Sequence, residues 1–173
     1  LNGKRNGKGK EYYDNGELKF EGEYLNGERN SKGIEYYKDG KLLFIGGYLR
    51  GKRWDGKGYD KNGNIEFEIK GGKGKIKEYY DDEELKFEGE YLNGEINGKG
   101  KEYSEDGEVS FEGEFLNGKR WNGKGREYYN NGFLKFEGDY LNGKGKEYYY
   151  NGELEFEGEY LNGKRKGKGK ENN

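Results

Sequence analysis

The chain has 173 residues, of which 39% are charged and only 28% are hydrophobic, yet its formal net charge is only −2. It contains no cysteine and no histidine, which excludes disulfides, zinc sites built on these residues and catalytic triads that use imidazole. The 18 tyrosines and 9 phenylalanines supply apolar area instead, so the composition permits a thin, aromatic-lined core and excludes a deep one.

One sequence pattern recurs along the whole chain. Its clearest copy covers residues 8–27, KGKEYYDNGELKFEGEYLNG. The phenylalanine of the pattern recurs every 20 to 25 residues, at Phe20, Phe44, Phe67, Phe87, Phe111, Phe136 and Phe156. Self-similarity at such a period is typical of tandem-repeat proteins, and we therefore expect about seven repeats.

Each repeat is expected to form a β-hairpin. Apolar residues alternate with charged ones between Leu18 and Tyr24, which predicts a half-buried antiparallel strand. Asn15-Gly16 predicts a tight turn, because glycine accepts a positive φ. We expect a three-residue loop with a glycine bulge, which places Tyr12 opposite Leu18 and Glu11 opposite Lys19.

Comparing the copies predicts which face is buried. The first tyrosine of the Tyr-Tyr pair never varies, whereas the second does, so Tyr12 is expected in the core and Tyr13 at the surface. Gly22 and its equivalents lie mid-strand, where we expect an aromatic ring of the next hairpin to lie over the bare backbone.

The order Phe-x-Gly-x-Tyr-Leu-x-Gly, followed by Gly-x-Gly, resembles the MORN repeat family, and Gly-Lys-Gly-Lys-Glu-Tyr-Tyr resembles its bacterial variant. The resemblance implies an all-β fold over residues 1–173, an elongated single-layer antiparallel sheet of tandem hairpins. Residues 55–77 depart from the pattern, because Ile69 replaces the mid-strand glycine and Gly71-Gly72 replaces the Tyr-Leu pair, so a kink or break is expected there. Both ends fall within a repeat, and we expect the array to be part of a longer one.

The sequence shows no set of residues typical of a catalytic site. We therefore expect no enzymatic activity, no bound metal and no cofactor. Carboxylates are abundant, but they alternate with lysine on a face expected to be solvated. Gly-x-Gly runs such as Gly98-Lys99-Gly100 lie between predicted strands and lack the helix that a phosphate-binding loop requires.

Basic residues gather at one predicted end of the strands, where they form a candidate edge for contact with anionic lipid. The alternative is that they only keep exposed turns soluble. Trp54 and Trp121 directly follow Lys-Arg pairs in this edge, either as interfacial anchors or as rings folded over their own hairpins. The candidate edge comprises Lys4, Arg5, Lys52, Arg53, Trp54, Lys119, Arg120, Trp121, Lys164, Arg165 and Lys166.

The second tyrosines form another candidate surface, for protein docking, with the alternative that a single-layer sheet needs rings on both faces to stay folded. They are Tyr13, Tyr37, Tyr80, Tyr129 and Tyr149.

The leading hypothesis is a scaffold that binds a protein partner whose identity the sequence does not give. The first alternative is peripheral binding to an anionic phospholipid membrane, and the second, implied by the family resemblance, is antitoxin-like neutralisation of a toxin. The net charge of −2 argues against nucleic acid. Open sheet ends would allow self-association. We expect a cytoplasmic protein that meets membranes only at their surface.

Overall fold

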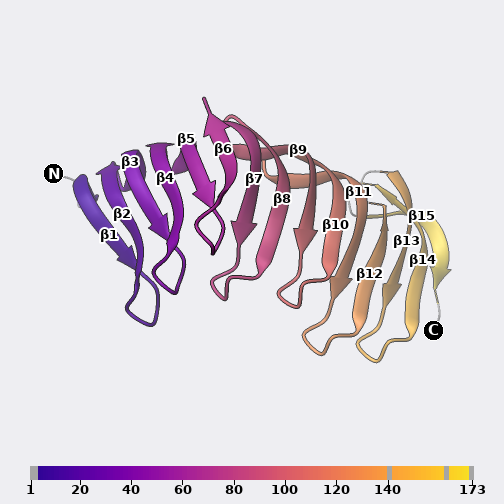
Figure 1. Ribbon diagram of the computed structural model, residues 1–173. Coiled ribbons are helices and arrows are strands. Elements are labelled where there is room, and N and C mark those ends of the chain that lie inside the picture. Colours follow the sequence, from indigo (N-terminus) through magenta and orange to yellow (C-terminus); the bar gives the residue numbers. More distant parts are fainter. Residues whose placement is uncertain (1–3, 140–141, 162–163, 172–173) are drawn as a thin grey trace. The chain divides into compact units, whose positions relative to one another are not determined.

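The computed structural model describes residues 4–139, 142–161 and 164–171, in which the regular elements are all β-strands (Figure 1). The strands are β1 (Gly7–Tyr12), β2 (Leu18–Leu25), β3 (Glu28–Tyr36), β4 (Leu42–Leu49), β5 (Lys52–Tyr59), β6 (Ile65–Lys70), β7 (Lys73–Tyr79), β8 (Leu85–Leu92), β9 (Glu95–Tyr103), β10 (Val109–Leu116), β11 (Lys119–Tyr128), β12 (Leu134–Asp139), β13 (Asn142–Tyr148), β14 (Leu154–Leu161) and β15 (Lys164–Glu171). The described strands follow one another through a single sheet in their sequence order, and the paired strands are antiparallel. The predicted all-β sheet of consecutive hairpins is therefore confirmed.

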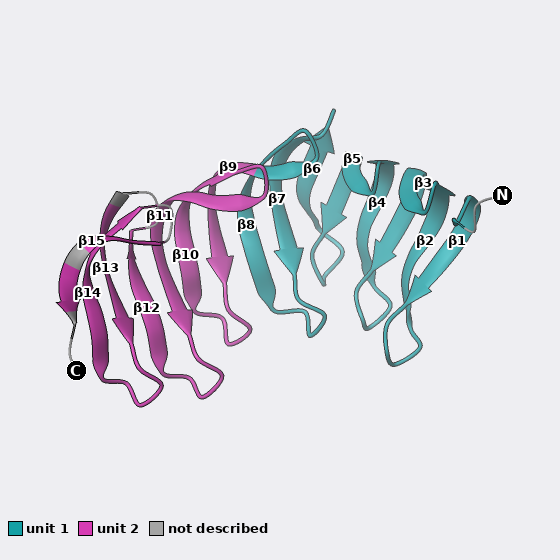
Figure 2. Cartoon of the chain, turned by 180° about the vertical axis from the view of Figure 1, so that it is seen from behind, with its two compact units in different colours: residues 1–96 teal, residues 97–173 magenta. Residues whose placement is uncertain are grey.

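The chain divides into two compact units, unit 1 (Leu1–Ile96) and unit 2 (Asn97–Asn173), shown in teal and magenta in Figure 2. The boundary falls inside β9, so residues 55–77, where the sequence predicts a kink or break, lie within unit 1. Here Ile69 and Ile76, which are 1% and 2% exposed, are buried at positions that glycine occupies in other repeats. The irregular segment is therefore packed into unit 1 and does not separate the two units.

The Asn-Gly turns have the predicted three-residue loop but an additional bulge. The backbone N–H of Tyr13 donates to the carbonyl of Glu17 at 2.8 Å, and Gly16 has φ +85°. Tyr12 lies opposite Leu18 as expected, but Glu11 lies opposite Phe20. The prediction that Glu11 faces Lys19 was wrong, because Lys19 is a bulged residue with no partner across β1.

This bulge decides which tyrosine reaches the core. Residues that face one another across an antiparallel pair share a face, so Glu11 and Phe20 lie on one side and Tyr12 and Leu18 lie on the other. We call the Phe20 side the inner face and the Tyr12 side the outer face. Tyr12 is 59% exposed, so its expected place in the core was wrong.

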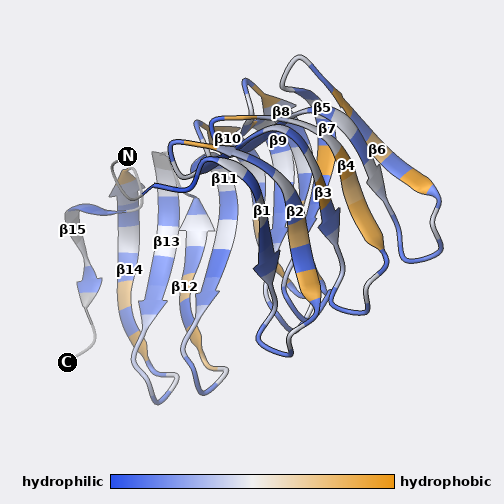
Figure 3. Cartoon of the chain, turned by 90° about the vertical axis from the view of Figure 1, so that its left-hand side faces the viewer, coloured by the Kyte–Doolittle hydropathy of each residue, from blue (hydrophilic) through white to orange (hydrophobic). Residues whose placement is uncertain are grey.

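The core consists of the predicted phenylalanines, of the rings four residues after Phe20, Phe44, Phe87, Phe111 and Phe156, and of Tyr37, Ile69 and Ile76. Phe20 and Tyr24 are 0% and 5% exposed, and their rings meet edge to face with centroids 5.6 Å apart. In Figure 3 hydrophobic segments alternate with hydrophilic ones along the strands, as expected for a sheet whose two faces differ. The buried aromatic residues are Phe20, Tyr24, Tyr37, Phe44, Tyr48, Phe67, Phe87, Tyr91, Phe111, Phe115, Phe136, Phe156 and Tyr160.

The mid-strand glycines form rows across the sheet, with Gly22 facing Gly9 on one side and Gly33 on the other. A Cβ on Gly22 would lie 2.6 Å from the Phe20 ring and 2.8 Å from the Gly33 Cα. The position is therefore crowded by the backbone of β3 and by a ring of its own strand, β2. The expected ring of a neighbouring hairpin lies instead over Gly33, where a Cβ would meet both Phe20 and Tyr48. Close approach is therefore confirmed, but at the neighbouring glycine.

The turns at the opposite end of the strands link each repeat to the one before it. Asn26 and Gly27 both have positive φ, which is typical of a two-residue type I′ hairpin turn. The N–H of Gly27 donates to the carbonyl of Arg5 at 2.9 Å. In unit 1 the same bond recurs from Gly51 to Arg29 and from Gly72 to Trp54.

Candidate binding surfaces

The described residues contain no cluster of acidic side chains arranged to hold a metal ion. Nor do they contain a helix with the length and apolar character required to cross a membrane.

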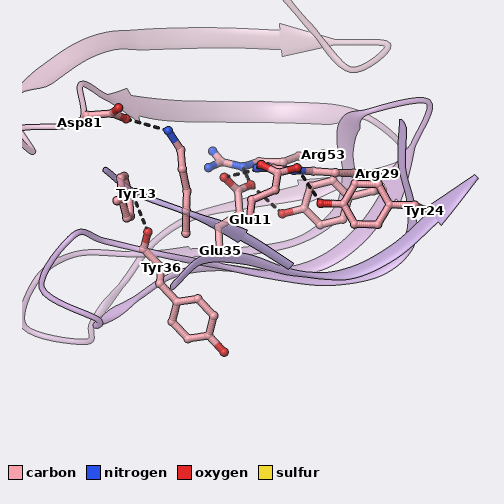
Figure 4. A network of polar contacts seen from close by, with 10 residues as sticks. Glu11, Tyr13, Tyr24, Arg29, Glu35, Tyr36, Arg53 and Asp81 are labelled. Carbon is pink, nitrogen blue, oxygen red and sulfur yellow. Dashed lines mark hydrogen bonds and ion pairs between the residues drawn. The ribbon is translucent and has the colours of Figure 1, made fainter. Parts of the chain in front are cut away.

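The inner face of unit 1 carries a ladder of charged side chains above the phenylalanine core (Figure 4). The Tyr24 hydroxyl donates to Glu11 Oε1 at 2.6 Å, and Arg29 Nη2 lies 2.6 Å from Glu11 Oε2. The guanidinium of Arg29 also lies 4.0 Å from the centroid of the Phe20 ring. Each arginine is therefore held by a carboxylate and an aromatic ring together.

The next repeat copies this arrangement. The Tyr48 hydroxyl and Arg53 Nε each donate to Glu35 Oε1 at 2.6 Å, and Arg29 Nη1 lies 3.3 Å from Glu35 Oε2. Arg29 therefore bridges two glutamates, and the ladder is continuous from Glu11 to Arg53.

Unit 2 contains the same three-residue set. Glu147 accepts hydrogen bonds from the Tyr160 hydroxyl at 2.8 Å and from Arg165 Nε at 3.0 Å. Arg120 Nε donates to Glu102 at 2.5 Å, and Phe115 occupies the position that tyrosine has in the other copies. In these four copies the arginine follows its glutamate by 18 residues.

Burial makes the Glu35 site strongly coupled. Burial alone would raise the pKa of Glu35, but the charges of Arg53 and Arg29 and the hydrogen bonds from Arg53 and Tyr48 outweigh it and lower this pKa to about 2. The side chains of Glu35 and Arg53 are only 13% and 15% exposed. The pair is therefore a structural interaction inside unit 1 and is not available to a ligand.

This ladder divides the predicted basic edge. Arg53 and Arg120 turn inward to glutamates, so their assignment to an exposed edge was wrong, and the guanidinium of Arg165 is likewise engaged by Glu147 and Glu155. Lys52 is paired with Glu95. The remaining basic positions of the edge are exposed: Lys4, Arg5, Lys119, Lys164 and Lys166.

The two tryptophans have different environments. Trp54 packs against the next turn, where a Cβ on Gly72 would lie 2.6 Å from its ring, so it covers the neighbouring hairpin and not its own. Trp121 is 45% exposed and remains a candidate anchor.

The second tyrosines were assigned to the wrong face. The hydroxyls of Tyr13, Tyr37 and Tyr129 each donate to the backbone carbonyl of the first tyrosine in the following repeat, at 2.8 Å. Tyr37 is 2% exposed, while Tyr80 is partly buried and Tyr149 is 43% exposed. Most of these tyrosines therefore fasten neighbouring hairpins together, because the bulge before each phenylalanine shifts them to the inner face.

The outer surface carries a feature that sequence reasoning missed. The leucine that ends β2, β4, β8, β10 and β14 is 40–53% exposed, although it occupies a fixed position in the repeat. The signal was the leucine in Tyr-Leu-Asn-Gly, which alternates onto the face opposite the buried tyrosine. The exposed leucines are Leu25, Leu49 and Leu92 in unit 1, and Leu116 and Leu161 in unit 2.

Comparisons with known proteins identify the repeat. Residues 20–41, 87–109, 111–133 and 156–171 match the MORN repeat, and residues 5–26 and 141–162 match the MORN repeat variant. No curated protein matches the chain. The matched segments cover most of the chain, with residues 42–86 between them, and the chain therefore belongs to the MORN repeat family.

Proposed function

We propose that this chain is a non-enzymatic repeat scaffold that binds a partner protein through its outer face. The observation that supports this is the regular row of exposed leucines on a surface that carries many charged side chains and, between them, exposed apolar residues such as Tyr12 and Ile45. The fold does not require these leucines to be apolar, because the inner aromatic core and the ladder hold neighbouring hairpins together. Exposed apolar groups with polar surroundings are typical of protein interaction surfaces.

The test compares protein capture by the immobilised wild-type chain and by a variant with Leu25, Leu49 and Leu92 changed to serine. A control variant changes three exposed turn residues, Glu17, Lys41 and Glu108, to serine. We expect the wild-type chain and the control variant to capture a defined partner, and the leucine variant to lose it. This binding should persist at high salt, since burial of apolar area does not depend on charge. Equal capture by all three proteins would contradict binding through the leucine row.

A second candidate function is peripheral binding to anionic membranes, and one observation favours it. Leu116 and Leu161 are paired with the exposed residues Lys119 and Lys164 of the following strands, which places apolar and basic groups side by side. Such a pairing suits the boundary between headgroups and acyl chains.

Flotation with neutral and anionic liposomes at low and high salt tests this candidate. Binding should require anionic lipid, weaken with salt and fall in Lys119→Glu, a residue outside the internal ladder. No flotation under any of these conditions would remove membrane binding from consideration.

A further inference from the structure

Strand β4 departs from the repeat in a way that packing does not demand. The equivalent strands β2 and β8 both read LKFEGEYL, whereas β4 reads LLFIGGYL. All three charged positions are lost, at Leu43, Ile45 and Gly47, so β4 carries no charge (Figure 3 shows a long hydrophobic stretch along it).

The change extends to the neighbouring strand. Ile34 on β3 faces Ile45 on β4, in a row where other repeats pair a basic residue with a glutamate. Ile45 is 42% exposed on the outer face, so burial in the core does not account for it. The equivalent pairs are the ion pairs Lys10–Glu21, Lys101–Glu112 and Lys146–Glu157, with N–O distances of 3.3, 3.3 and 3.9 Å.

The packing of the fold does not require glycine at position 47 either. A Cβ at Gly46 would lie 2.1 Å from the carbonyl oxygen of Asp55, so backbone packing requires glycine there. A Cβ at Gly47 would meet nothing closer than 3.7 Å, which is ordinary contact. Between Ile45 and Leu49 the missing side chain therefore leaves an opening into which a foreign side chain could fit.

A groove leads along the outer face to this opening. Its volume is about 510 Å³, its floor is the backbone of Gly9, Gly22 and Gly33, and its wall ends at Lys32 and Ile34. It crosses the strands, because its floor follows the facing glycines of β1, β2 and β3. A concave channel of this kind suits a chain segment and does not suit a flat bilayer.

The charges beside the opening favour an acidic ligand. Lys32 faces Gly47 and Lys57 faces Ile45, both lysines are exposed, and neither forms an ion pair within the described part of the chain. Of the nearby carboxylates, Asp55 faces Gly47 and accepts a hydrogen bond from the backbone of Gly71 at 2.7 Å. Glu68 faces Lys57 from β6, and its Oε1 lies 3.7 Å from Lys70 Nζ. Glu21 is held by Lys10 and by the Tyr36 hydroxyl, while Glu23 faces Lys8 across the groove.

We propose that the strip of Ile34, Ile45, Gly47 and Leu49 docks an extended peptide segment of a partner protein, with an apolar side chain flanked by carboxylates. The apolar side chain enters the opening above Gly47, and the carboxylates reach Lys32 and Lys57. The proposal rests on the protein-binding function proposed above and assigns it to one repeat of unit 1.

The experiment is selection from a displayed library of random peptides against the full chain, followed by titration of the selected synthetic peptides. The first variant, Ile34→Lys/Ile45→Glu, restores the residues of the other repeats, and the second, Gly47→Glu, restores the glutamate of β2 and β8. A matched control, Lys146→Glu/Glu157→Lys, reverses an ordinary pair in unit 2. Circular dichroism checks that each variant is folded.

We expect selected peptides with a large apolar residue beside aspartate or glutamate. They should bind Ile34→Lys/Ile45→Glu and Gly47→Glu about ten- to a hundredfold more weakly than wild type, the range for losing one buried apolar side chain, and bind the control unchanged. Lys32→Glu should also weaken them.

Several results would overturn the proposal: no enrichment on the wild-type chain, selection of basic peptides, or equal binding to all variants.

Conversion of a dimer to a monomer by Ile34→Lys/Ile45→Glu would identify a second copy as the occupant, and loss of liposome binding would identify a lipid surface. If the leucine-dependent partner is still captured by Ile34→Lys/Ile45→Glu, the protein-binding function stands and this location fails. If wild type captures no partner, the function itself fails.

Discussion

Replacing Glu35 by glutamine should remove a large, pH-dependent part of the stability of unit 1. Glu35 lies in the interior with Arg53 and Arg29, and its pKa falls from the usual 4.5 to about 2. That difference corresponds to about 3 kcal/mol of folding free energy at neutral pH. Glutamine keeps the shape of the side chain but leaves Arg53 without its nearest negative charge.

The direction with pH follows from the lowered pKa. A carboxylate with a depressed pKa in the folded state stabilises the protein above the pKa of the unfolded chain, and this contribution is lost as the pH falls through the folded-state pKa. The difference in stability between wild type and Glu35→Gln should therefore be about 3 kcal/mol above about pH 5 and should shrink towards zero near pH 2.

Urea unfolding followed by circular dichroism at a series of pH values measures this difference directly. Glu17→Gln, in an exposed turn, is the control and should track wild type throughout. A difference between wild type and Glu35→Gln that stays constant from neutral pH to pH 2 would refute the assignment of a coupled, buried ion pair.

Five further substitutions test the two faces of the sheet by the same unfolding assay. Phe87→Ala should cost about 3–5 kcal/mol because its ring is buried, whereas Tyr12→Ser should cost less than about 1 kcal/mol; similar costs would mean that the faces are reversed. Tyr37→Phe removes the bond to the next repeat and should cost about 1 kcal/mol, and an unchanged midpoint would argue against that bond. Gly33→Ala forces a Cβ within 2.5 Å of the Phe20 ring and should cost about 1–3 kcal/mol, while Gly47→Ala should be nearly neutral; equal effects would contradict the packing described for both.

The repeat, the hairpins and their turns could be predicted from the sequence because they depend on local signals. Alternation between Leu18 and Tyr24 and the Asn15-Gly16 turn each specify backbone geometry within a few residues. The phenylalanine at the centre of each copy is buried as expected.

The orientation of the tyrosines could not be obtained in this way. A bulge at Lys19 adds one residue to the strand, and a shift of one residue exchanges the faces of everything on the turn side of it. The invariance of Tyr12 among the copies was therefore a poor guide to burial. Its ring is exposed on the outer face, whereas the more variable Tyr13 is partly buried on the inner face.

The arginines escaped prediction for a different reason. The position of Arg53 beside an exposed turn suggested that its side chain is exposed to solvent. Its partner, however, is Glu35 on β3, 18 residues earlier in the chain. A charge next to a turn can reach back over a phenylalanine, because the long side chain covers apolar area while its guanidinium binds the carboxylate. The fixed spacing of 18 residues was present in the sequence, yet its meaning depends on how hairpins stack.

The fixed distances within the ladder bear on how such an array can grow. Glutamate, tyrosine and arginine lie within a span of 18 residues, shorter than the usual repeat of about 24. Copying any stretch of one repeat length in tandem therefore reproduces a complete set of partners, and each new arginine meets a glutamate already in place. Gene duplication can therefore lengthen the sheet without requiring a new interface between hairpins. The sequence of a single strand such as β4 can then diverge.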